Sequence, residues 1–184
     1  MKKIIIIAAA FVGFASVANA QSASSTATQQ VGLSLSDAIA LTFTGSGTSK
    51  GGAVTIPFAT VSDYANGVAS TSQALTVQSN KNFTVTVNTN SSNFTYTGST
   101  TPSPTMPVSG VLGIKVSANA TGGTVASPFS TSSYSSLTSS AQNLITNATY
   151  GGAQNFSIMY NATPGFAYPS GTYSTSVVYS ATQL

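Results

Sequence analysis

The chain has 184 residues, of which 41% are hydrophobic and only 4% charged, and it contains no His, Cys or Trp. All five cationic residues are lysines, and the only acidic residues are Asp37 and Asp63. General acid–base catalysis needs groups that titrate near neutrality, and a metal site needs several carboxylates, imidazoles or thiolates. We therefore expect no enzymatic activity, no catalytic residue, no metal and no cofactor.

The first twenty residues have the pattern of a signal peptide. Lys2 and Lys3 precede an apolar run at 4–14, and Ala18-Asn19-Ala20 is a small-x-small cleavage site. The apolar run is too short to span a bilayer, which needs roughly 20 residues. We expect residues 1–20 to be removed on secretion and no later segment to span a membrane.

Most of the basic charge belongs to this signal peptide. Residues 21–184 hold three lysines and two aspartates, a net charge of +1. Such a weak charge does not favour nucleic-acid binding. Solubility must come instead from hydroxyl groups, because the chain has 31 Ser and 27 Thr.

Apolar residues alternate along the start of the chain after the signal peptide. The interval 31–43 would be about 43 Å long at ~3.3 Å per residue, if fully extended. It predicts one long strand, or two strands kinked at Asp37, with a short helix around 36–40 as the alternative. The alternating residues are Val31, Leu33, Leu35, Ile39, Leu41 and Phe43.

Further alternating segments follow, each bounded by turn-forming residues. We expect strands at 54–58, 75–79, 83–87, 94–96, 112–118, 156–162 and 173–181. The short connection 79–82 favours a hairpin between the second and third of these. A proline-rich loop is expected at 100–107, little order at 120–140, and a helical turn within 137–145.

This pattern indicates an all-β fold, most simply an antiparallel β-sandwich of about seven to nine strands, with a small closed barrel as the alternative. One core is feasible at this length. We expect a signal peptide at 1–20, an N-terminal segment at 21–44 and a β-sandwich domain at 45–184.

The aromatic residues permit a ligand hypothesis. Tyr150 and Tyr168 lie near predicted loops and could stack on sugars, as in a monomeric adhesin that binds host or matrix glycans. Tyr160, Tyr173 and Tyr179 fall at inward positions of their strands, which favours the core for these three.

The N-terminal segment permits a different function. An alternating strand can pair with its own sheet or be donated to a neighbouring subunit, where main-chain hydrogen bonds give affinity and alternate side chains give specificity. A chain with few charges also has few edge charges to oppose such pairing. The candidate assembly residues are Val31, Leu33, Leu35, Ile39, Leu41 and Phe43.

Two stretches carry a family resemblance. Residues 169–179, which contain Gly171-Thr172-Tyr173, resemble the last strand of exported bacterial immunoglobulin-like pilin and surface-fibre domains. Residues 75–87 are similar to a hairpin of small secreted β-sandwich proteins of the Bacteroidota. The resemblance covers about 25 residues. The chain departs from many chaperone–usher pilins in lacking their Cys pair, and from lipoprotein-type pilins in lacking a Cys at the cleavage site.

What the resemblance implies is an immunoglobulin-like sandwich with an extracellular structural role. The chain would be a secreted subunit of a pilus or cell-surface filament, a homo-oligomer of identical subunits assembled by strand exchange. A monomeric adhesin or carbohydrate-binding module is the alternative.

Overall fold

A computed structural model describes residues 27–44 and 51–184 of the chain. The predicted signal peptide at 1–20 lies outside the described residues. The chain divides into two units, with the boundary between Leu35 and Ser36. The second unit contains all the regular secondary structure of the described residues: twelve strands and one short helix.

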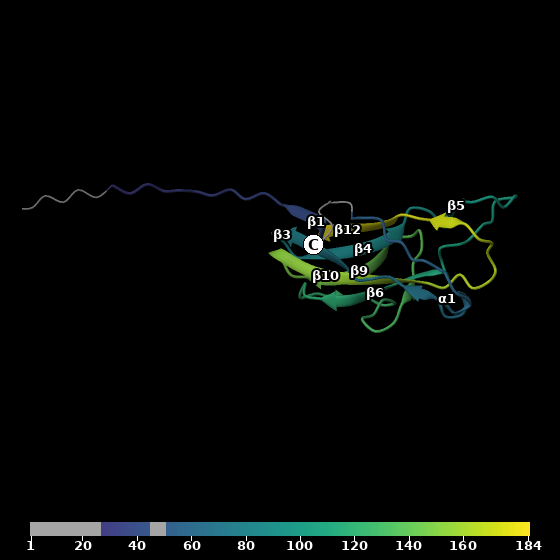
Figure 1. Cartoon of the computed structure of the whole chain (residues 1–184). Coiled ribbons are helices and arrows are strands. Elements are labelled where there is room, and N and C mark those ends of the chain that lie inside the picture. Colours follow the sequence, from purple (N-terminus) through teal and green to yellow (C-terminus); the bar gives the residue numbers. More distant parts are fainter. Residues whose placement is uncertain (1–26, 45–50) are drawn as a thin grey trace, which may run out of the picture. The chain divides into compact units, whose positions relative to one another are not determined.

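The larger sheet has six antiparallel strands. Five of them lie in the order β1-β3-β10-β6-β8, and β2 also pairs with β10. Figure 1 labels β1, β3, β10 and β6 of this sheet. β3 pairs with residues 151–158 of β10, and β2 pairs with its last two residues, 161 and 162. β3 and β2 are therefore successive partners of the same strand. The strands are β1 (Ile39–Thr44), β2 (Val68–Ala69), β3 (Gln73–Ser79), β6 (Leu112–Asn119), β8 (Ser135–Ser136) and β10 (Gly151–Ala162).

The second large sheet has four antiparallel strands in the order β12-β4-β9-β7, and a separate two-stranded sheet pairs β11 with β5. In Figure 1, β5 and α1 (Val61–Asn66) lie at the end of the β-rich unit opposite the C-terminus. The strands of these sheets are β4 (Phe83–Thr89), β5 (Thr95–Thr97), β7 (Thr124–Val125), β9 (Gln142–Ala148), β11 (Thr172–Ser174) and β12 (Val177–Gln183).

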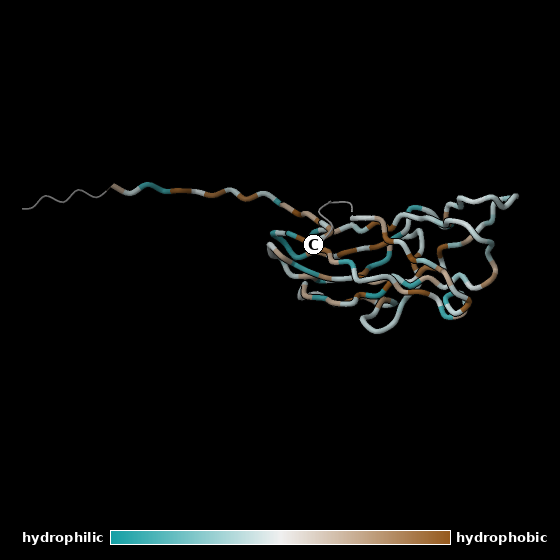
Figure 2. Tube along the Cα trace, viewed as in Figure 1, coloured by the Kyte–Doolittle hydropathy of each residue, from teal (hydrophilic) through white to brown (hydrophobic). Residues whose placement is uncertain are grey.

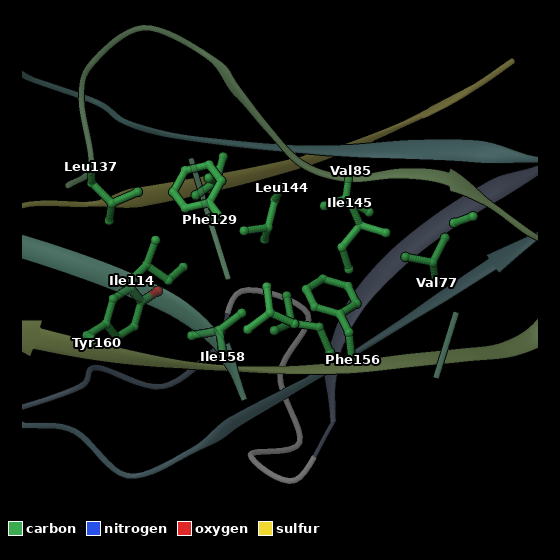
Figure 3. Close-up of a cluster of buried hydrophobic side chains, with 14 of the residues drawn as sticks. Val77, Val85, Ile114, Phe129, Leu137, Leu144, Ile145, Phe156, Ile158 and Tyr160 are labelled. Carbon is green, nitrogen blue, oxygen red and sulfur yellow. The ribbon is translucent and has the colours of Figure 1, made fainter. Parts of the chain in front are cut away.

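The hydrophobic core lies between the two large sheets. Alternate residues of β3, β4 and β6 are buried, as a strand with one inward face requires. Figure 3 shows the labelled core side chains pointing toward one another from the two layers. The core comprises Leu75, Val77, Phe83, Val85, Val87, Val108, Leu112, Ile114, Val116, Phe129, Leu137, Leu144, Ile145, Ala148, Phe156, Ile158 and Tyr160. The prediction of an all-β antiparallel sandwich is confirmed, and the strands form separate sheets rather than one closed barrel.

The predicted hairpin at 75–87 is wrong, although both of its strands exist. β3 lies in the six-stranded sheet and β4 in the four-stranded sheet, so the connection between them crosses from one layer to the other. The Ser79 hydroxyl stabilises this crossing by accepting the Lys81 N–H and donating to the Lys81 carbonyl. Period-two alternation is the same in a hairpin and in such an arch, so the pattern could not distinguish them.

The predicted helical turn within 137–145 is also wrong, because β9 begins at Gln142. Val85 pairs with Ile145 and Thr86 pairs with Asn143, so Leu144 is an extra residue in the strand. This β-bulge turns both Leu144 and Ile145 into the core. Two adjacent buried residues break the alternation that identifies a strand in the sequence.

The region 120–140, expected to have little order, contributes to the core. Phe129 and Leu137 are both buried there, and the short strands β7 and β8 pair at the sheet edges. Conversely, the strand predicted at 54–58 is absent, and α1 was not predicted. Thr60 caps α1 by accepting the Asp63 N–H, while Asp63 accepts the Thr60 N–H in return.

Candidate functional site

The described N-terminal residues 27–38 form no helix or strand, and the strand predicted from Val31 is therefore shorter than expected. Val31, Leu33 and Leu35 expose 77%, 86% and 86% of their surface. Figure 2 shows hydrophobic positions interspersed with hydrophilic ones in the segment that precedes β1. An extended apolar set of this kind is costly to leave in water, at roughly 25 cal/mol per Å² of apolar surface.

The other half of the candidate assembly set lies within the β-rich unit. Ile39, Leu41 and Phe43 belong to β1, which pairs with β3 of the same chain from Ile39 opposite Ser79 to Thr44 opposite Ala74. Leu41 and Phe43 pack against the core. β1 therefore falls on the sandwich side of the boundary at Ser36, rather than with the expected segment 21–44.

The start of β1 is held by Asn80. Its side-chain amide donates to the Ser36 carbonyl (2.8 Å), its side-chain oxygen accepts the Ala38 N–H (2.9 Å), and its own N–H donates to the Ala38 carbonyl (3.2 Å). β3 ends at Ser79 and the chain then turns away, so the residues before Ile39 have no β3 partner to extend the ladder.

The two acidic residues have local structural roles. Asp37 pairs with Lys81 at 2.8 Å, and because both side chains are exposed the pair adds little stability. Hydrogen bonds from the Thr60 and Ala59 N–H groups lower the pKa of Asp63. Within residues 27–44 and 51–184 no group of three or more acidic side chains could hold a metal ion. In the same ranges no helix is long and apolar enough to cross a membrane.

A groove of about 810 Å³ opens at the end of the sandwich where β1 stops. Among the described residues, none of those that line it carries a charge. Its wall includes apolar side chains from the core or packed against it, so the groove is continuous with the interior. These are Phe43, Met106, Leu112, Tyr160, Ala162 and Val177.

Residues 51–58 line the same groove without forming a strand. Val54 is exposed, and Ile56 and Phe58 are half-buried. No backbone hydrogen bond joins residues 51–58 to another described residue. The alternation that predicted a strand is thus present, but the chain supplies no neighbouring strand within the part that is described.

Aromatic side chains gather around the groove. The ring centroids of Phe58 and Tyr64 are 5.3 Å apart. Tyr64 also stacks on Phe166, with 5.6 Å between the ring centroids and 25° between the ring planes. Phe166 exposes 66% of its surface. Aromatic pairs at these separations are worth about 0.5–1.5 kcal/mol beyond their burial, so the cluster gives this end of the molecule a firm apolar rim.

The tyrosines proposed for sugar stacking are not brought together. Tyr168 lies at the groove, 6.3 Å from Tyr173 in ring centroid distance. Tyr150 is 62% exposed and donates its N–H to Asn82, which lies beside the C-terminus at the other end of the sandwich. Tyr173 was expected in the core, but it lies in the separate β5–β11 sheet, where its ring centroid is 5.0 Å from that of Tyr96.

Tyr160 and Tyr179 do lie inward, as expected. Their hydroxyl oxygens are 2.8 Å apart and form a hydrogen bond between β10 of one sheet and β12 of the other. Burial raises the pKa of Tyr160 to about 12, and burial together with the neighbouring Tyr160 raises that of Tyr179 well above its ordinary value. Both hydroxyls stay neutral at physiological pH, and the pair ties the two layers together beside the groove.

No protein-family model matches the chain, and comparison with curated proteins finds no match. Two features bear on function: the exposed N-terminal segment, and the groove whose described lining residues carry no charge.

Proposed function

We propose that the protein is a structural subunit of an extracellular filament, in which the N-terminal segment of one subunit pairs as a β-strand with the next. The donated residues are Val31, Leu33 and Leu35. If the N-terminal signal peptide is removed as its pattern predicts, the subunit is exported before it assembles.

The observation that carries the proposal is the exposure of three alternating aliphatic side chains immediately before the sandwich. Single exposed apolar residues are ordinary on protein surfaces, whereas a contiguous apolar set marks an interaction site. In an extended strand Val31, Leu33 and Leu35 point to the same side, and Gly32 and Ser34 point to the other. Such a strand presents one apolar face to a partner.

The energy of this pairing is sufficient for a filament that responds to concentration. Burying three aliphatic side chains contributes roughly 5–9 kcal/mol. Ordering five residues costs about 1–2 kcal/mol each, and each new main-chain hydrogen bond returns about 0.5–1.5 kcal/mol. These amounts leave a net gain of a few kcal/mol, from which the cost of lost translational and rotational freedom must be subtracted, so we expect polymers that form at high protein concentration and dissociate on dilution.

The sheet edges are also suited to association. The outermost strands are β1 and β8 in one sheet and β12 and β7 in the other, and none of the four contains a charged residue. Lysines on edge strands are a common means of preventing edge-to-edge pairing. Their absence from these strands favours β-mediated assembly.

The test compares three forms of residues 21–184 by light scattering and negative-stain electron microscopy. The unmodified chain should form filaments or a ladder of oligomers. Leu33→Asp with Leu35→Asp should abolish them, because two charges would enter an apolar contact. Ser34→Asp places one charge on the opposite face of the same strand, so it should retain polymers.

Circular dichroism shows whether each form is folded. A double variant that polymerises like the unmodified chain would contradict the proposal, and so would an unmodified chain that stays monomeric at every concentration. If the double variant fails to fold, the segment is part of the sandwich rather than a donor.

A second candidate is a monomeric adhesin that binds a neutral glycan. Tyr64, which lines a groove with no charge among its described residues, stacks on the exposed Phe166, and this pair favours the adhesin because sugars stack on exposed aromatic faces. This function predicts binding of the monomer to immobilised glycans, with loss of binding in Phe166→Ala and no change in Tyr150→Ala.

A further inference from the structure

We propose that the groove at the α1 end of the sandwich is the acceptor for a second copy's N-terminal segment, and that residues 52–58 become the strand with which it pairs. This inference rests on the filament function proposed above. It specifies where on the neighbouring subunit the donated residues bind.

The chemistry of the groove selects its occupant. The groove is uncharged among the described residues and reaches the core through Met106, Leu112 and Tyr160. An anionic ligand or a nucleic acid would find no cation among the described residues that line it. A neutral apolar chain segment fits, and residues 27–36 of this protein contain no charge and present Val31, Leu33 and Leu35 in alternation.

Beside the groove, the sheet lacks a strand among the residues that the structure describes. Within residues 27–44 and 51–184, the last residue of β1 is Thr44, opposite Ala74, and β1 has no pairing with β2. Within the described residues β2 pairs only with β10. At the same end, residues 52–58 have strand-like alternation but no strand partner in the described part of the chain. An added strand would give this segment the pairing that it lacks.

Pro57 fixes the side on which the partner pairs. In an antiparallel ladder alternate residues direct both main-chain groups to the same neighbour, so residues 54, 56 and 58 serve one side and residues 53, 55 and 57 the other. Proline has no N–H and is tolerated where that side faces away from a partner. The donated strand therefore pairs on the side of Val54 and Ile56.

The donor must come from a second copy. Ser36 and Ala38 are held by Asn80 at the start of β1, whereas the groove lies at the far end of that strand beside Phe43. Ser36 precedes β1, whose six residues cover about 20 Å. Residues 31–35 of the same chain extend at most about 17 Å from Ser36, so they cannot fill a groove at the far end of β1.

The natural chain has no cysteine, so introduced thiols allow an unambiguous cross-linking test. One preparation of residues 21–184 carries Ser34→Cys as the donor. It is mixed with a second preparation that carries either Thr55→Cys, in the proposed acceptor, or Ala40→Cys, on the exposed face of β1. A short bis-maleimide reagent then joins thiols on neighbouring subunits. Because the reagent bridges a range of distances, it reacts even if the pairing register differs by a residue or two.

We expect the Ser34→Cys form to cross-link to Thr55→Cys at least tenfold more than to Ala40→Cys. Adding Leu33→Asp and Leu35→Asp to the donor should remove the cross-linked dimer. Circular dichroism confirms that each variant is folded before mixing.

Two other outcomes distinguish a wrong acceptor site from a wrong filament function. Preferential cross-linking to Ala40→Cys would overturn the groove as acceptor and leave strand donation intact, with the edge of β1 as its site. No cross-linking to either position, together with monomers in light scattering, would overturn both.

Discussion

The hydrogen bond between Tyr160 and Tyr179 gives a quantitative prediction about how the two sheets are held together. Replacing Tyr160 by Phe leaves the Tyr179 hydroxyl buried without its partner, which should cost about 1–3 kcal/mol of unfolding free energy. Tyr179→Phe should cost a similar amount. Replacing both removes donor and acceptor together while the rings remain, so the double change should cost less than the sum of the single changes.

The assay is urea unfolding of dilute protein, followed by far-ultraviolet circular dichroism. The double-mutant cycle should give a coupling energy of about 1–2 kcal/mol, a magnitude typical of residues in direct contact. Additive costs, with a coupling near zero, would show that the two hydroxyls do not depend on one another and would refute this account of the contact.

The same pair predicts a loss of stability in alkali. The pKa of Tyr160 is raised to about 12 in the folded protein and that of Tyr179 is also raised well above its ordinary value, whereas tyrosine in an unfolded chain titrates near ~10. A raised folded pKa means that the stabilisation is complete below about pH 10 and is lost as the pH rises toward about 12. The double Phe variant should lose less stability over that interval. Tyr173, whose pKa is also raised by burial and neighbouring tyrosines, should preserve part of the effect.

Three further predictions concern the sandwich and are measured by denaturant unfolding. Gly123→Ala should lower the unfolding free energy by about 1–3 kcal/mol, because a Cβ there would lie 2.6 Å from the Thr146 carbonyl oxygen. Gly152→Ala, where the Cβ would enter open space, should change it little. Equal effects of the two variants would contradict this account. Ile158→Ala, at a fully buried position, should cost about 2–5 kcal/mol and Ile158→Val about 0.5–1.5 kcal/mol, so a small effect of the alanine would contradict the core assignment. The pKa of Asp63 is lowered in the folded protein, so the stabilisation by its carboxylate is lost as the pH falls below about 4. Asp63→Asn should therefore lose less stability at acid pH than the unmodified chain. An unchanged dependence of stability on acid pH would exclude this role for Asp63.

Alternation identified most of the sheet. The strands at 75–79, 83–87, 112–118 and 156–162 are present because each has one buried face, and that is what period two records. The sequence pattern did not predict which strands pair with one another. Leu75 and Phe83 both face the core whether their strands share a sheet or oppose one another, so the crossing at Ser79 could not be distinguished from a hairpin.

Bulges and missing neighbours account for other differences. Leu144 and Ile145 are both buried because β9 contains an extra residue, and a local pattern gives no sign of where a partner strand inserts one. Val54, Ile56 and Phe58 alternate like a strand yet form none, because a strand also needs a neighbour. Alternation reports the face that a segment can bury, whereas the partner is decided by the rest of the fold.

The candidate site was predicted in part. Val31, Leu33 and Leu35 were recognised as an alternating set, and they are exposed. The sequence could not separate them from Ile39, Leu41 and Phe43, which follow the same parity. The difference lies in the turn at Asn80, which ends the ladder at Ile39 and depends on a residue far along the chain. The groove has no sequence signature, because its wall comes from segments between Phe43 and Val177.

Hydrogen exchange at residues 31–35 is the most direct measurement of strand donation. In concentrated samples of residues 21–184, the amides of this segment should exchange slowly, because a donated strand has its main-chain groups paired in the neighbouring subunit. On dilution, and in the Leu33→Asp, Leu35→Asp variant at any concentration, they should exchange at the rate of unstructured chain. Fast exchange of these amides in intact filaments would contradict the account, since the subunits would then be joined by some other surface.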